Sequence, residues 1–90
     1  MGTAIVKIKL MPESPETDLE EIKQHAEKII KEYNGTPART EEEPIAFGLT
    51  AVIITFSMPE SQELEPIEVS LSKINNVNSV QVIDMRRAFS

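Results

Sequence analysis

Residues 4–35 read AIVKIKLMPESPETDLEEIKQHAEKIIKEYNG, and two hydrophobic periods follow one another within this stretch. From Ala4 to Leu10 an apolar residue recurs at every second position, with lysines at 7 and 9, which is typical of a strand with one buried face. The segment Met11–Pro15 ends this strand, because each of its two prolines lacks a backbone donor. A change from period two to helical spacing after such a break predicts a strand followed by a helix.

The second half of this stretch carries the signals of both helix ends. Thr17 followed by Glu20 is the pattern of a capping box and predicts the start of the helix. Asn34-Gly35 predicts a left-handed C-cap at its end. Between them, the apolar residues fall within an arc of about 100° on a helical projection; they are Leu19, Ile22, Ala26, Ile29, Ile30 and Tyr33.

The rest of the chain predicts three more strands and a second helix. Thr36–Glu43 is polar and contains Pro37, as expected of an edge strand, and Leu49–Phe56 is apolar and β-branched, as expected of a central one. Pro44–Gly48 is the turn between them. The second helix begins near Pro66, with Val69 facing outward, and its buried side is formed by Leu64, Ile67, Leu71 and Ile74. The last strand runs from Val80 to about Arg86.

The order βαββαβ within 90 residues predicts a ferredoxin-like α+β sandwich formed by a single domain, residues 1–90. Right-handed crossovers place both helices on one face of a four-stranded antiparallel sheet in the order 4-1-3-2.

The amino-acid composition of the chain argues against several classes of function. The net charge of −6 and the scarcity of aromatic residues argue against direct nucleic-acid binding. No segment approaches the roughly 20 apolar residues of a membrane span, and no signal peptide is visible, so we expect a cytoplasmic protein. The chain has no cysteine, and no cofactor motif appears.

The sequence shows no catalytic constellation. His25 lies about 40° outside the apolar stripe and has no second base or nucleophile, which favours a surface histidine. Glu41, Glu42 and Glu43 alternate between the faces of a strand, so they cannot converge on one metal ion. We therefore expect neither an enzyme nor a metal site.

Three features point to a partner. Phe47 lies in the turn Pro44–Gly48 and is either an exposed anchor for a partner's pocket or folded back over the end of the sheet. Arg86 and Arg87 either meet an anionic site on a partner or pair with Asp84 or a nearby glutamate. The open face of the sheet should carry an apolar patch, flanked by Lys7, that includes Ile5, Ile53 and Ile83 and marks a contact surface.

Three segments resemble archaeal translation elongation factor 1-beta, and the likeness extends over essentially the whole chain. They are Met11–Ser14, the block EPIAFGL at Glu43–Leu49, and the ending VQVIDMRR at Val80–Arg87. This family has a ferredoxin-like fold and acts as guanine-nucleotide exchange factor of elongation factor 1-alpha. The resemblance therefore implies that GTPase, in its GDP-bound and nucleotide-free forms, as the partner.

The resemblance also implies roles for individual residues. Phe47 matches an aromatic residue that the eukaryotic factor inserts into a pocket of the second domain of the GTPase, and Ile45 beside it joins the expected contact. The eukaryotic factor disturbs the magnesium and phosphate site with a lysine near its C-terminus. At that position this sequence has Ser90, and no lysine follows Lys73, so we expect Arg86 or Arg87 to take the role.

A second function class stays open on the same fold. The apolar open face could instead belong to a regulatory domain that senses a small molecule or forms a homodimer. Binding of elongation factor 1-alpha, as opposed to binding of a metabolite or a second copy, separates the two.

Overall fold

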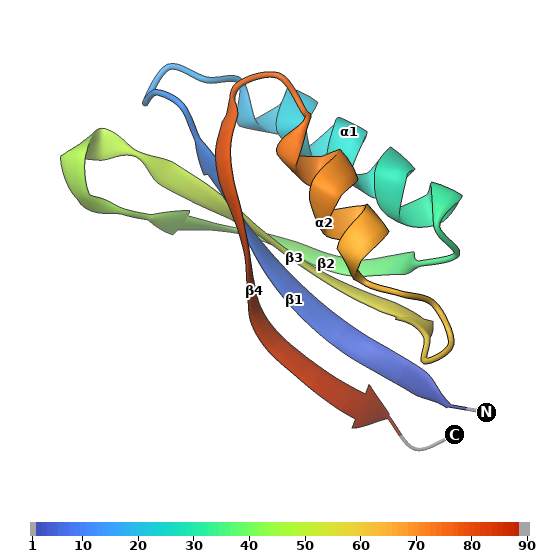
Figure 1. The fold of residues 1–90 in the computed structure, drawn as a ribbon. Coiled ribbons are helices and arrows are strands. Elements are labelled where there is room, and N and C mark those ends of the chain that lie inside the picture. Colours follow the sequence, from blue (N-terminus) through green and yellow to red (C-terminus); the bar gives the residue numbers. More distant parts are fainter. Residues whose placement is uncertain (1, 89–90) are drawn as a thin grey trace.

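The sheet consists of four antiparallel strands, and both helices lie on one of its faces (Figure 1). The computed structural model describes residues 2–88. In chain order the elements are β1 (Thr3–Pro12), α1 (Leu19–Glu32), β2 (Thr36–Pro44), a 3₁₀ turn (Ala46–Gly48), β3 (Thr50–Pro59), α2 (Glu65–Ser72) and β4 (Val77–Ala88). The strand order β2-β3-β1-β4 confirms the predicted ferredoxin-like topology.

The core lies between the sheet and the helices, as the periodicities predict. Every second residue of β1 and β3 points toward the helices and is buried, including Ile8, Ile54 and Phe56, which are fully covered. Ile22 and Ile30 of α1 and Ile67 of α2 close the core from the other side. Within residues 2–88, no helix is long and apolar enough to cross a membrane.

The start of α1 differs from the prediction by one residue. Asp18, not Thr17, is the N-cap, and its carboxylate accepts hydrogen bonds from the backbone N–H groups of Glu20 and Glu21. Thr17 instead contacts Ser14, whose backbone N–H donates to the Thr17 hydroxyl at 3.3 Å. The predicted capping box is therefore wrong, because the threonine hydroxyl is used by the turn that precedes the helix.

The predicted C-cap is confirmed, and its two residues have different tasks. Asn34 takes the left-handed conformation with φ 68°. Gly35 donates its N–H to the Ile30 carbonyl at 2.8 Å. A Cβ on Gly35 would lie 2.5 Å from the Ile30 side chain, so this position needs glycine for the close approach of strand and helix.

All four strands are longer than predicted. Three of them, β1, β2 and β3, end in a proline, which is tolerated as the last residue of a strand. Pro12 ends β1 and Pro59 ends β3, where a missing donor removes no internal ladder bond. β4 starts at Val77 and reaches Ala88, and its pairing with β1 shifts register between Lys7 and Ile8. There Lys7 is opposite Asp84 and Ile8 is opposite Val82, so Ile83 is left without a partner on β1.

Candidate functional site

β2 and β3 are joined by a tight hairpin turn, and its two central residues, Phe47 and Gly48, have left-handed backbone conformations. Both residues have positive φ, 64° for Phe47 and 76° for Gly48. The Leu49 N–H donates to the Ala46 carbonyl at 3.4 Å, and the Ile45 N–H donates to the Leu49 carbonyl at 2.7 Å. Two successive left-handed residues give a type I′ turn, whose twist matches that of the flanking strands.

Phe47 is an unusual residue for such a turn. Type I′ turns favour asparagine and glycine, and a left-handed conformation costs other residues about 1 kcal/mol or more. The ring nevertheless stays 94% exposed, so packing within the chain does not compensate this strain. The structure therefore confirms the exposed alternative for Phe47, and strain at an exposed aromatic residue is typical of a functional position. Ile45 is half-buried at the base of the turn.

The three glutamates that precede the hairpin each pair with a different cation. Glu43 lies 3.5 Å from the Lys9 Nζ, Glu42 lies 2.6 Å from the Lys23 Nζ, and Glu41 lies 3.3 Å from the Arg39 Nε. They diverge, as predicted, and no group of three or more potential metal ligands occurs within residues 2–88. The hydrogen bond from Lys23 to Glu42 raises the pKa of Lys23 above its ordinary value of 10.5. The pairs of Glu43 and Glu42 join the base of the hairpin to β1 and α1, whereas the pair of Glu41 lies within β2.

Arg86 and Arg87 lie at the opposite end of the sheet and point to opposite faces. Arg86 is opposite Ile5 of β1 and therefore on the open face, whereas Arg87 is opposite Ala4 and on the helix side. The Arg86 Nε donates to the Asp84 carboxylate at 3.1 Å, and the Arg87 Nε lies 3.3 Å from the Glu60 carboxylate. Both guanidinium groups remain largely exposed. The ion-pair alternative thus describes the free chain, and both groups remain accessible to a partner.

A shallow pocket surrounds these arginines and contains residues that sequence reasoning missed. It has a volume of about 280 Å³ and is lined by Ala4, Glu60, Met85, Arg86 and Arg87. The Met85 side chain is 55% exposed, so an apolar side chain beside the arginines is also accessible to a partner. Glu60 comes from the segment after β3, and nothing in its sequence neighbourhood signalled that it would meet the last strand. Ser90, where the resemblance places the lysine of the eukaryotic factor, lies outside the described residues.

The predicted apolar patch on the open face is wrong. Ile53 is only 8% exposed, because Lys9 lies opposite it and reaches across β3 to Glu43 on β2. Ile5 is exposed, but the polar row of Lys7, Thr55 and Asp84 separates it from Ile53. Ile83 is exposed at the register shift, not within the regular pairing. The isoleucines therefore form no continuous surface, and the expected partner contact of Ile53 loses its physical basis.

The Phe47 hairpin and the arginine pair occupy opposite ends of the elongated molecule. The register places Thr50, next to the hairpin, and Pro59 at the two ends of β3, and Pro59 is joined through Thr3 to Ala88 of β4. Ten residues of strand separate these ends by about 30 Å. Figure 1 shows the hairpin at one end of the sheet and the C-terminal end of β4 at the other. A single small ligand cannot touch both, whereas a large protein surface can.

Comparisons with known proteins agree with a partner-binding role. Residues 5–88 match the family model described as EF-1 guanine nucleotide exchange domain. Elongation factor 1-beta of Methanosarcina barkeri is 41% identical over 88 residues, which cover 97% of this chain and 99% of that protein. Elongation factor 1-beta of Methanothermobacter thermautotrophicus is 42% identical over 89 residues, with 97% and 98% covered.

Solved structures with low sequence identity share the fold. Ribosomal protein S6 of Thermotoga maritima aligns with a TM-score of 0.69 at 19% identity, over 97% of this chain and 89% of that one. The ACT domain of the GTP pyrophosphokinase of Chlorobium tepidum aligns with a TM-score of 0.62 at 11% identity, over 88% and 96%. At such identities the likeness concerns the fold alone.

Proposed function

The chain belongs to the family of EF-1 guanine nucleotide exchange domains, and from this premise we propose that it promotes GDP release and GTP reloading on translation elongation factor 1-alpha. The family match across residues 5–88 carries this proposal. The exposed, strained Phe47 supports it, because a ring held out of the core in an unfavourable conformation suits a partner's pocket.

Nucleotide exchange of this kind needs no acid, base or nucleophile. A factor that binds the nucleotide-free GTPase more tightly than the GDP-bound form must, by linkage, weaken GDP binding by the same ratio. A thousandfold weakening corresponds to about 4 kcal/mol of differential binding. Cellular GTP then fills the emptied site.

The two ends of the sheet are assigned different tasks in this proposal. Phe47, with Ile45 at its base, anchors the factor in an apolar pocket of the GTPase. Arg86 and Arg87 approach the nucleotide site, where their charge competes for phosphate or for the groups that hold it. Ile53 takes no part, because its side chain is covered.

The test is the release of a fluorescent GDP analogue from the cognate elongation factor 1-alpha. We expect substoichiometric amounts of this protein to accelerate release in the presence of excess GTP. An unchanged release rate at saturating protein contradicts the proposal. The regulatory alternative predicts instead that a small metabolite or a second copy of the chain binds tightly and that the GTPase is not bound.

A further inference from the structure

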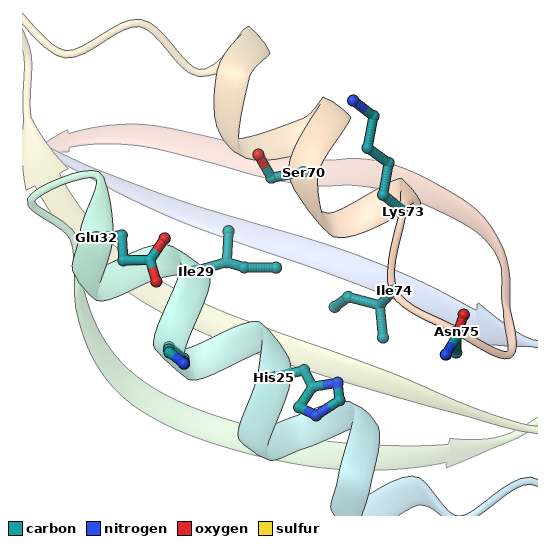
Figure 2. A pocket seen from close by; sticks show the side chains of 8 residues that line it. His25, Ile29, Glu32, Ser70, Lys73, Ile74 and Asn75 are labelled. Atoms are coloured by element: carbon teal, nitrogen blue, oxygen red, sulfur yellow. The ribbon is translucent and has the colours of Figure 1, made fainter.

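A groove runs between the two helices, on the layer that faces away from the sheet. It consists of two adjoining hollows of about 420 and 460 Å³ that share Ser70 and Lys73. Figure 2 shows Ile29 of α1 and Ile74 after α2 projecting into the space between the helices. Of the two helices that border the groove, α2 has 8 residues and α1 has 14.

Apolar side chains form part of the floor of the groove, beside polar ones. Ile29 and Tyr33 pack against the core and remain partly accessible. Val69 on α2 is 45% exposed and contributes nothing to the core between the helices and the sheet. The Tyr33 and Ser70 hydroxyls lie 3.3 Å apart and join the C-terminal end of α1 to α2. Apolar side chains are thus available to a third element laid along the two helices.

The charges along the groove are segregated. Two lysines, Lys28 and Lys73, line the end of the groove that includes His25, and Lys73 also borders the second hollow. Acidic side chains line the other end, and these are Glu32, Glu63 and Glu65. Within residues 2–88, neither Lys28 nor Lys73 has a carboxylate at ion-pair distance, although the chain is strongly acidic overall. The basic end is therefore free to meet acidic groups of another molecule.

We propose that this groove binds a short amphipathic helix of a partner protein, with an acidic first turn and a basic last turn. Acidic residues stabilise the positive N-terminal end of a helix and basic residues its negative C-terminal end. Such a helix matches the groove in one direction, with its acidic turn at His25, Lys28 and Lys73 and its basic turn at Glu32. From His25 to Tyr33 the groove extends about 12 Å, which is roughly two helical turns and seats two or three apolar residues on one face.

This inference is independent of the proposed exchange function. The groove lies on the helices, between the two ends that are assigned to the GTPase. A helix bound there leaves both Phe47 and the arginine pair uncovered. The protein could therefore hold a second partner while it acts on the GTPase, and loss of either activity leaves the other measurable.

The probe is a synthetic peptide of sequence SEELAALLAKKK, with SQQLAALLAQQQ as its uncharged control, titrated into the isotope-labelled protein. We expect the charged peptide to shift the backbone amide signals of His25, Lys28, Val69 and Asn75, and to bind about tenfold more tightly than the control. A nitroxide on the acidic end should broaden the signals of His25 and Asn75, and one on the basic end those of Glu32 and Tyr33. Equal shifts with both peptides, or shifts centred on Arg86 and Arg87, overturn the proposal.

Charge reversal provides the matched control. The double variant Lys28→Glu with Lys73→Glu should lose about tenfold or more in affinity for the charged peptide. Lys31→Glu removes the same kind of charge from α1 but lines a different hollow, against β2, so its affinity should be nearly unchanged. Equal losses in both proteins would show that only the net charge matters and that the groove is no site.

Discussion

The two ends of the sheet differ in whether their exposed side chains already have a partner within the chain. At the hairpin, the Phe47 ring contacts almost nothing and its backbone is strained. At the other end, Arg86 and Arg87 each pair with a carboxylate of their own chain. Burying the ring in a partner gains about 1.5–3 kcal/mol, whereas each arginine must first leave an existing ion pair. We therefore expect affinity to come from the hairpin and modulation of exchange from the arginines.

The sharpest contrast sets Phe47 against Phe56, which is fully buried on β3. Phe56→Ala should lower the free energy of unfolding by about 3–5 kcal/mol, because it leaves a cavity in the core. Phe47→Ala should change it by less than about 0.5 kcal/mol, because the ring packs against nothing. Urea denaturation of both variants measures the difference. A large loss of stability in Phe47→Ala would mean that the ring is part of the core.

Binding should reverse this contrast. Phe47→Ala is expected to weaken binding to elongation factor 1-alpha by about thirtyfold or more, the usual effect of removing a desolvated aromatic anchor worth about 2 kcal/mol. Calorimetric titration with the nucleotide-free GTPase measures the affinity. Wild-type affinity in this variant would remove the hairpin from the interface.

The double variant Arg86→Ala with Arg87→Ala should act mainly on exchange. We expect GDP release to slow by about tenfold or less, with residual binding and a weaker dependence on salt, because exposed charges chiefly affect encounter and local electrostatics. Arg39→Ala is the matched control, since Arg39 is also exposed and paired with a carboxylate but lies on β2. If both proteins release GDP at the wild-type rate, the arginines serve only their own ion pairs.

The strain at Phe47 can be measured separately from its contact. Phe47→Asn should raise the free energy of unfolding by up to about 1 kcal/mol, because asparagine accepts the left-handed conformation far better. For a domain of this size, that corresponds to a rise of about 4–8 °C in melting temperature. The same variant should lose GTPase binding. An unchanged melting temperature would show that the turn stores no strain.

The smallest effect concerns the ion pair at the base of the hairpin. Because Glu42 raises the pKa of Lys23, the folded chain binds this proton more tightly than the unfolded chain does. The contribution of the pair is therefore complete below about pH 10.5 and disappears as the pH rises through the raised pKa. Its size should stay below about 1 kcal/mol, as for other partly exposed pairs. Lys23→Gln should lower stability at neutral pH and converge with the wild type at high pH, in denaturant titrations across this range.

Much of the candidate site could be predicted from local chemistry. The proline and glycine around Phe47 indicate a turn between two strands, and a turn places its side chains at the surface. Whether the ring folds back could not be read from composition, because it depends on the two positive φ angles that aim it outward. Asp84 was a predicted partner of the arginines and pairs with Arg86, but Glu60 could not be singled out as the partner of Arg87, since the two meet only after β4 has paired with β1.

Hydrophobic period, prolines and helix-end signals determined the order of the elements, and chain connectivity then left one strand order. These signals act over a few residues, so the sequence alone expresses them. The folded structure decided the cap of α1, because the Thr17 hydroxyl accepts a hydrogen bond from the Ser14 N–H, three residues away, and Asp18 caps the helix in its place. It also decided the covering of Ile53, which depends on Lys9 and Glu43 meeting across an intervening strand. The first outcome depends on which of two possible hydrogen bonds Thr17 makes. The second depends on a contact between residues far apart in the chain, which only the folded structure brings together.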